Sequence, residues 1–541
     1  MRLRRLLGPV AGAATMIAAL TIVSRVLGFG RWLVQAETVG SGAVGDAYAS
    51  ANLVPNVLYE VVAGGALAGA VIPLLAGPIA RSVRADTDQI SSALLTWAFI
   101  GLTPVAVALS VFARPLAALL PEAAGADPAA QLEATTRFLQ IFAPQVVLYG
   151  IGVVLTGVLQ AHRRFLAPVL APIASTLVVI VSYLVFGALA NGLTNAPDGL
   201  PDAAFAWLAW GTTAGVAALS LPLLVPVYRC GVRLRPTVRF PPGVAVRARS
   251  LALAGLGSLL AQQASVLSVL WVSRAGGSAG TIVVFQWAQA VYLLPYAVLA
   301  VPVATAVFPR LAELASSDQS LFRRTTWSAT RAVVAVAILG AGVLVAVAPA
   351  VQQLFARCDG MGQCNDTTGM AQALTAMAPG VIGLSMIFLI SRALYSMDRS
   401  RAAVSATALG WLVVTATALL GVAAFAPDGG EGAQTLLILG VAHTAGMTVA
   451  GSALIVLLAS AMHTRVPAEL LRTCVVAGGG AVVGAVLGRW ATGTILDLAG
   501  PGAVAAVLAG TLGGMLAMLA VAGAVALADR GIVRVLRRSR A

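Results

Sequence analysis

Fourteen long apolar runs constrain the fold of this chain more than any other feature. Each is close to the roughly 20 mostly apolar residues that an α-helix needs to cross a membrane. Only 10% of the residues are charged, whereas soluble domains usually carry about 25%. No soluble core could bury this much apolar surface, so lipid must be the solvent. The runs cover residues 10–36, 47–77, 89–112, 132–160, 165–190, 203–228, 250–272, 280–308, 327–348, 370–397, 402–425, 434–460, 468–491 and 502–528.

The arginines predict how these spans are oriented. All 34 basic residues are arginine, and the formal net charge is +14. Such a charge could indicate nucleic-acid binding, but the arginines lie in alternate loops rather than on one amphipathic face. Arg163 and Arg164 occupy one such loop, whereas the intervening loops hold acids such as Asp198 and Glu431. The positive-inside rule then places both termini in the cytoplasm, and we expect no nucleic-acid partner.

A short internal repeat predicts two lobes. AGAVIPLLA at residues 68–76 is similar to ATAVFPRLA at 304–312, an offset of 236 residues that also aligns Arg163 with Arg399. Both pairs lie six spans apart, so the repeats share one orientation, as in transporters with parallel repeats. We therefore expect an all-α polytopic protein with a pseudo-two-fold axis along the membrane normal. The predicted parts are an N-lobe at 1–228, a C-lobe at 229–464, and two extra spans with a short basic tail at 465–541.

Polar residues inside apolar spans are the candidate functional residues, because ionisable groups at membrane depth are costly. Arg25 and Arg31 lie in the first span, and a guanidinium group matches phosphate oxygens well. In the second span Asn52, Asn56 and Tyr59 share one helical face. The predicted substrate-binding residues are Arg25, Arg31, Asp46, Asn52, Asn56, Tyr59, Glu60, Gln263, Gln289 and Arg392.

Each candidate also has a structural alternative. Arg25 and Arg31 could snorkel toward the membrane surface, and Arg25 could pair with Glu60. Asp46 could cap a helix. The amide side chains could bond neighbouring helices, and Glu60 could either carry a coupling proton or balance an arginine.

The chain has four cysteines and three histidines, which limits the disulfides and the catalytic sites that it can form. Cys358 and Cys364 lie in one predicted external loop, where oxidising conditions favour a disulfide, although two free thiols remain the alternative. No P-loop motif and no nucleophile–base pattern is visible, so the sequence predicts neither an enzyme nor a bound cofactor. A transport cycle would then draw on the membrane potential or a monovalent cation.

Several sequence segments resemble the MurJ (MviN) family of lipid II flippases, which belongs to the MOP exporter superfamily. These segments are SRVLGFGR (24–31), GGALAGAVIPLLA (64–76), TGVLQAHRRFLAPVLAP (156–172), LPYAVLAVPVATAVFPRL (294–311) and RALYSMDRSR (392–401). The resemblance extends from the first span to the eleventh.

This resemblance implies a bacterial cytoplasmic-membrane protein that supports peptidoglycan synthesis and cell shape. It would carry an undecaprenyl- or decaprenyl-linked muropeptide precursor to the outer leaflet by alternating access, with cell-wall synthesis or division proteins as candidate partners. Arg25 and Arg31 match a family arginine pair that meets the diphosphate, and Asp46 and Asn56 match cavity positions.

The chain departs from the family pattern at two places. Tyr59 stands where some members have a cavity arginine, and Gln289 with Ala290 stands where they have an Asp-Arg pair. A less basic pocket leaves three alternatives open: a flippase for another polyprenyl-linked glycan, an exporter like those of the MATE family, or a non-transporting scaffold for wall synthesis.

Overall fold

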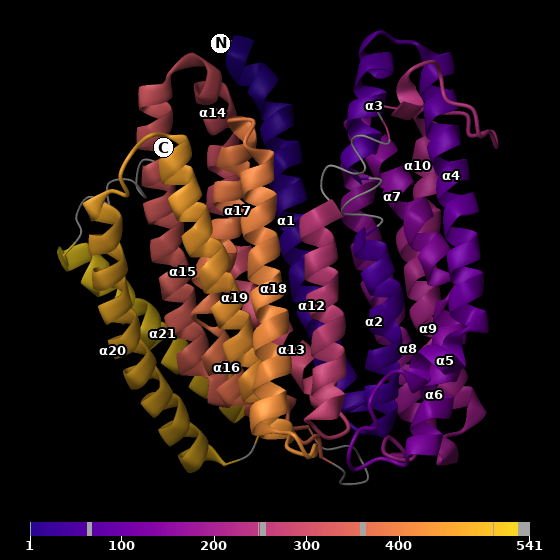
Figure 1. Cartoon of the computed structure of the whole chain (residues 1–541), viewed down its shortest axis with the longest axis vertical. Coiled ribbons are helices and arrows are strands. Elements are labelled where there is room, and N and C mark those ends of the chain that lie inside the picture. Colours follow the sequence, from indigo (N-terminus) through magenta and orange to yellow (C-terminus); the bar gives the residue numbers. More distant parts are fainter. Residues whose placement is uncertain are drawn as a thin grey trace. The chain divides into compact units, whose positions relative to one another are not determined.

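The computed structural model describes residues 2–61, 68–246, 248, 256–357, 364–500 and 502–528, and every regular element in them is a helix. The chain divides into two compact units (Figure 1). The first unit consists mainly of Met1–Pro121 and Ala126–Gln263, and the second mainly of Ala264–Arg357 and Asn365–Ala541. The predicted lobe boundary at 228/229 stays a prediction, and the first compact unit extends to Gln263.

The described part of the first unit contains α-helices and two single 3₁₀ turns. They are α1 (Arg2–Thr38), α2 (Ala43–Glu60), α3 (Ala68–Ala80), α4 (Arg84–Val111), α5 (Ala113–Ala118), α6 (Pro128–Phe142), α7 (Gln145–Ala161), α8 (Leu166–Ala190), η2 (Pro197–Gly199), α9 (Asp202–Ser220), η3 (Leu221–Leu223) and α10 (Leu224–Arg229). Part of its core is aromatic: the ring of Tyr48 meets Phe138, Phe142 and Tyr183 edge-on.

The second unit continues the helical pattern. It contains most of α12 (Leu256–Ala275), then α13 (Thr281–Pro295), η4 (Tyr296–Ala300), α14 (Val301–Ser317), α15 (Gln319–Phe355), α16 (Met370–Met377), α17 (Gly380–Ser396), α18 (Ser400–Phe425), α19 (Gly432–Ala461), α20 (Ala468–Ala499) and α21 (Ala503–Ala528). The element η4 is a π-helical turn. It follows Pro295, whose missing N–H disrupts the regular hydrogen-bond ladder.

Ten of the described helical segments are long and apolar enough to cross a membrane, or eleven if the bent pair α16 and α17 forms one span. They correspond to predicted spans three to six and eight to fourteen. The other predicted spans coincide with α1, with α2 and α3, and with α12, and each includes residues whose side chains lie outside the described set. The structure thus supports a polytopic all-α membrane protein, and the count of fourteen stays a prediction.

Both units contain the same arrangement of packed helices. In the first, α3 packs on α4 and α7, and α8 packs on α9; in the second, α14 packs on α15 and α17, and α18 packs on α19. Each unit also breaks one span at an Ala-Pro pair, at Pro144 between α6 and α7 and at Pro379 between α16 and α17. These features match the predicted repeat.

The turns that end α7 and α17 refine the alignment of that repeat. Arg163 and Asp398 both adopt the left-handed conformation, with φ of 58° and 57°. The next N–H groups donate five residues back, from Arg164 to the Leu159 carbonyl and from Arg399 to the Leu394 carbonyl. The turn geometry therefore pairs Arg164, rather than the predicted Arg163, with Arg399.

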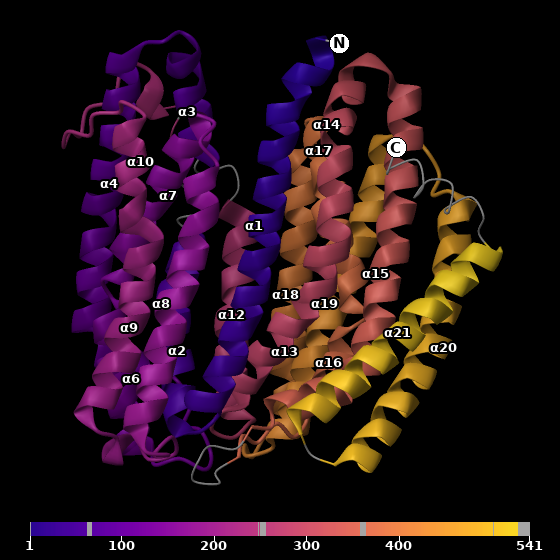
Figure 2. The same cartoon turned by 180° about the vertical axis from the view of Figure 1, so that it is seen from behind.

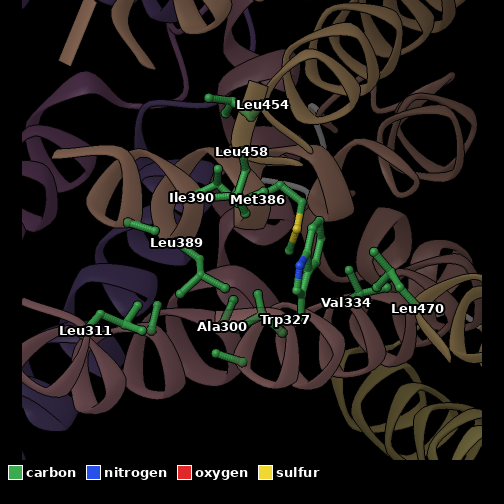
Figure 3. Close-up of a cluster of buried hydrophobic side chains, with 14 of the residues drawn as sticks. Ala300, Leu311, Trp327, Val334, Met386, Leu389, Ile390, Leu454, Leu458 and Leu470 are labelled. Atoms are coloured by element: carbon green, nitrogen blue, oxygen red, sulfur yellow. The ribbon is translucent and has the colours of Figure 1, made fainter. Parts of the chain in front are cut away.

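A single apolar cluster joins α20 and α21 to the rest of the second unit. Leu470 and Ala477 from α20 and Val521 from α21 belong to the same buried cluster as Trp327 of α15. In Figure 3 the Trp327 ring lies beside the Met386 side chain of α17. Figure 2 shows α20 and α21 against α15, and all three helices contact one another. The last two spans are thus packed into this unit.

Candidate functional site

Helix α2 presents a buried polar residue in its first turn. Gly42 is the N-cap of this helix, four residues before Asp46. Asp46 is fully buried, and the Nε2 of Gln131 on α6 donates to its Oδ2 over 2.7 Å. The alternative that Asp46 is an N-cap is therefore wrong. Asp46 holds α6 against α2 in this conformation, and its contact with substrate stays a prediction.

A second group of polar residues lies two to four turns farther along α2, where Asn56 and Tyr59 meet one residue of α7. The hydroxyl of Tyr149 donates to Oδ1 of Asn56 over 3.0 Å. The rings of Tyr149 and Tyr59 lie 4.3 Å apart between centroids. Asn56 and Tyr59 thus share the face that their spacing predicts. Asn52, one turn before Asn56, is half-buried.

A cavity of about 390 Å³ opens beside these residues. That volume falls in the range of about 300–1,000 Å³ typical of small-molecule sites. The wall is formed by α2, α3, α7, α8 and α9, all from the first unit. The lining residues are Tyr59, Glu60, Ile72, Tyr149, Gly152, Val153, Thr156, Gly157, Gln160, Pro168, Ala171, Pro172, Leu219 and Ser220.

One wall of this cavity carries an unsatisfied hydroxyl. The Oγ of Ser220 is buried, and it has no hydrogen-bond partner among the described residues. Buried polar atoms are normally paired, so this hydroxyl is free to bond a group that enters the cavity. Gly152 lies against it: a Cβ there would sit 2.4 Å from Ser220 Oγ. The carboxyl of Glu60 and the hydroxyl of Ser220 give the cavity a polar part within otherwise apolar walls.

Arg25 and Arg31 extend from α1, which packs on α8. Arg25 is exposed and Arg31 is partly buried. At 100° per residue, their side chains leave the helix about 120° apart. The Arg31 guanidinium lies 5.0 Å from the ring centre of Trp32. The two arginines therefore lie on different faces of α1, and their binding role stays a prediction.

The predicted residues of the second unit have separate surroundings. Arg392 of α17 donates from Nη1 to the Phe388 carbonyl over 2.9 Å, with its guanidinium 3.4 Å above the Phe388 ring. These contacts lie one turn back along the same helix. Gln289 on α13 is half-buried, and Gln263 on α12 is buried. Their roles in substrate binding also stay predictions.

Among the cysteines, Cys364 is disulfide-bonded, whereas Cys230 and Cys474 are free. The predicted partner Cys358 lies outside the described residues, so the pairing stays a prediction. Within the described part of the chain no group of three or more metal-ligating side chains is present.

Sequence reasoning missed Tyr149 and Ser220. Both stand inside long apolar spans, and the signal that could have found them is the same one that selected Asn56: a polar side chain at membrane depth. It also missed His443 on α19, which is fully buried with its ring edge-on to Tyr292. The Nε2 of His443 and the hydroxyl of Tyr292 have no hydrogen-bond partner among the described residues.

Comparisons with known proteins agree on one family. A family model described as "Lipid II flippase MurJ" matches residues 35–496. A "Probable lipid II flippase MurJ" of Rhizobium tropici is 25% identical over 415 residues, covering 75% of this chain and 74% of the relative. A "Lipid II flippase MurJ" of Burkholderia cenocepacia is 25% identical over 421 residues, covering 74% and 76%.

Solved structures show the same fold. "Lipid II flippase MurJ, inward closed conformation" matches with a TM-score of 0.67 at 16% identity, covering 93% of this chain and 98% of that one. An inward-facing MATE family multidrug resistance transporter of the MOP superfamily matches with a TM-score of 0.63 at 14% identity, covering 82% and 95%.

Proposed function

This chain belongs to the lipid II flippase MurJ family, and from that premise we propose that it moves a lipid-linked peptidoglycan precursor from the inner to the outer leaflet of the bacterial cytoplasmic membrane by alternating access. The observation that carries the proposal is the family match over residues 35–496. The protein is a multi-pass membrane transporter rather than an enzyme. Both termini lie in the cytoplasm in this proposal, as the arginine distribution favours.

The substrate divides between two solvents during transport. Each CH₂ of the prenyl chain contributes about 0.8 kcal/mol when it stays out of water, so the tail remains in lipid while the polar head crosses through protein. An undecaprenyl chain and a decaprenyl chain on the substrate fit this scheme equally well. The cavity of about 390 Å³ holds a small part of a disaccharide-pentapeptide head, so further surfaces must contribute.

Arg25 and Arg31 bind the diphosphate in this proposal. A guanidinium group remains charged at all physiological pH values and offers a fork of N–H donors to phosphate oxygens. The exposed position of Arg25 and the partial exposure of Arg31 keep both groups accessible to an anion. Asp46, Asn52, Asn56, Gln263, Gln289 and Arg392 are the remaining candidates for the polar head.

Glu60 is the candidate coupling residue. Its carboxyl lines the first-unit cavity with Tyr59, Tyr149 and the unpartnered hydroxyl of Ser220. A proton or another monovalent cation that reaches this carboxyl would change the charge at the cavity. Each elementary charge moved across the membrane gains about 2.3 kcal/mol per 100 mV, so the membrane potential can drive one step of the cycle.

Complementation tests the proposal. The chain is expressed in a strain depleted of its own lipid II flippase, and lipid II at the outer leaflet is measured directly. We expect rescue with restored exposure, and loss of both with Arg25→Ala or Arg31→Ala at equal membrane expression. Arg324→Ala, which removes an exposed arginine at the start of α15, is the matched control and should still rescue.

Failure to rescue despite good expression would favour a second function. Tyr59 and the Gln289-Ala290 pair replace charged residues of the family pattern, which favours a different polyprenyl-linked glycan as cargo. Rescue by a variant that lacks lipid II exposure would instead indicate a scaffold for wall-synthesis or division proteins. The likeness to a MATE transporter concerns the fold alone.

A further inference from the structure

A ten-residue segment between α10 and α12 lies along α4 and carries charge on its outer side. Gly231, at φ +83°, lies in the turn after α10, and the chain GVRLRPTVRF at residues 231–240 then forms neither helix nor strand. We call these ten residues the strap. Figure 1 shows it beside the upper ends of α4 and α10. Pro236 inside the strap and the two prolines after it disfavour a helix.

Hydrogen bonds fix the strap to one face of α4. Three of its backbone N–H groups donate to α4 side chains one turn apart: Arg233 to Asp88 Oδ1, Arg235 to Ser92 Oγ and Thr237 to Thr96 Oγ1, over 3.0, 3.0 and 3.2 Å. Two residues of extended chain rise about 6.6 Å, and four residues of helix rise about 6 Å. The two rises match, so every second residue of the strap can bond to every fourth residue of α4.

Alternation along the strap separates its apolar and basic side chains, as expected of extended chain. Val232 is buried, and Leu234 and Phe240 are partly buried against the same apolar cluster of the first unit. The arginines are exposed: Arg229 just before the strap, and Arg233, Arg235 and Arg239 within it. Packing therefore holds Val232, Leu234 and Phe240 against the first unit, which leaves a row of guanidinium groups outside.

The strap ends where the exposed surface of α4 becomes apolar. Trp97 is 51% exposed, and its indole N–H donates to the Val238 carbonyl over 3.0 Å. Val238 is itself 50% exposed, and the large exposed hydrophobic residues of α4 begin at Trp97. A half-exposed tryptophan at such a border is typical of the membrane interface. The row of arginines thus lies next to the headgroup level.

The charges around the strap favour an anionic ligand. The acids of α4 nearest to it are Asp86 and Asp88, and Asp88 accepts the Arg233 N–H. Arg81, in the turn before α4, and Arg84, the first residue of α4, are two further exposed arginines. Among the described residues, none of these arginines forms an ion pair within 4.0 Å.

We propose that the strap binds anionic phospholipid headgroups of the surrounding leaflet. Arg233, Arg235 and Arg239 contact the phosphates, while Trp97 and Val238 contact the upper acyl chains. A phosphatidylglycerol-like headgroup matches this surface because its charge lies at the level of the arginines and its tails at the level of Trp97. This role is independent of the transported substrate, so it can hold or fail whatever the cargo is.

Brominated lipids test the proposal through Trp97. The full chain is placed in nanodiscs that contain either brominated phosphatidylglycerol or brominated phosphatidylcholine, and tryptophan quenching is measured. Trp97→Phe identifies the part of the signal that comes from Trp97. We expect brominated phosphatidylglycerol to quench Trp97 at a much lower mole fraction than brominated phosphatidylcholine. Each guanidinium near an anionic surface contributes about fivefold in affinity, so R233Q/R235Q/R239Q should reduce the preference on the order of 100-fold.

A charge-matched variant supplies the control. R310Q/R324Q/R401Q removes three exposed arginines of the second unit and should leave the Trp97 preference unchanged. An equal loss in both triple variants would overturn the proposal, because net charge alone would then explain it. Unchanged preference in the strap variant would also overturn it. If soluble glycerol phosphate relieved the quenching as effectively as added phosphatidylglycerol, the ligand of the strap would be a soluble anion instead.

Discussion

Tyr149 shows how single residues organise the candidate site. It reaches α2 through two different contacts, a hydrogen bond to Asn56 and a ring contact with Tyr59. Ser220 of α9 and Gly152, one turn after Tyr149 on α7, line the same cavity. One aromatic side chain of α7 thus sets the position of two predicted residues of α2.

Replacing Tyr149 by Phe should destabilise the protein modestly. The change keeps the ring contact with Tyr59 and removes the hydroxyl that donates to Asn56, so we expect a loss of about 1 kcal/mol in unfolding free energy. Titration of purified protein with a denaturing detergent measures it. Tyr228→Phe removes a hydroxyl from a residue that is 76% exposed and should have no effect. Equal effects of both changes would contradict the assigned hydrogen bond.

Asp318, in the loop before α15, predicts a pH dependence. Its Oδ1 accepts from the Leu321 N–H and from the N–H and hydroxyl of Ser320. These bonds, that from Leu321 first, hold the pKa of the carboxyl below its usual 3.8. Because the folded pKa is lowered, the contribution of Asp318 is complete above pH 3.8 and disappears as pH falls through the folded value.

Thermal unfolding across that pH window checks the role of Asp318. Asp318→Ala should lower the melting temperature at neutral pH, and the difference from the natural chain should shrink in acid. Asp318→Asn keeps an N-cap side chain and cannot ionise. The difference in melting temperature between Asp318→Asn and Asp318→Ala should therefore stay constant across this pH range. If Asp318→Ala lowered the melting temperature by the same amount in acid, the carboxylate would not be the stabilising group.

At the scale of elements, the glycines of α20 show why two helices can approach closely. A Cβ on Gly484 would lie 2.9 Å from Ala517 Cα, and one on Gly480 would lie 2.8 Å from Ala524 Cβ. Gly480, Gly484 and Gly488 are four residues apart and all buried. Their spacing in the sequence predicts this contact, because lipid gives apolar helices little other reason to associate.

Gly484→Ala and Gly479→Ala form a matched pair on α20. An alanine at 484 meets the α21 backbone, so we expect a destabilisation of about 1–3 kcal/mol from overpacking. An alanine at 479 has nothing within 4 Å, so its better helix propensity should leave stability equal or raised by up to about 1 kcal/mol. Unfolding in denaturing detergent measures both. A similar loss at both positions would exclude helix contact as the cause.

Apolar length predicts where most helices lie, but it does not predict their breaks. The predicted span 132–160 is divided at Pro144 into α6 and α7, and the span 370–397 is divided at Pro379. Hydropathy is insensitive to such breaks, because one proline changes the mean hydropathy of a span-length window only slightly. The periodicity of α2 predicts that Asn56 and Tyr59 share a face, yet it cannot identify Tyr149 as their neighbour, since helix pairing depends on tertiary packing.

At the scale of the whole molecule, the sequence predicts residues 465–541 as two extra spans after two lobes, and this division stays a prediction. In the structure α20 and α21 pack on α15 of the second unit. Leu470, Ala477 and Val521 belong to its buried cluster. The Nη1 of Arg489 donates to Thr375 Oγ1 on α16 over 2.8 Å. Such polar contacts, together with close packing, hold helices together in lipid.

A chain split in the loop between α19 and α20 should therefore reassemble. Fragments 1–464 and 465–541, expressed together in one membrane, should copurify, because α20 and α21 of the short fragment pack on α15 of the long one. Gly488→Leu in the short fragment should reduce copurification, since a Cβ at this position already lies 2.7 Å from Ala346 Cβ on α15. Gly478→Leu, where a Cβ has nothing within 4 Å, should leave it unchanged. Inserted fragments that fail to copurify would mean that covalent connection, rather than packing, keeps the last two spans in place.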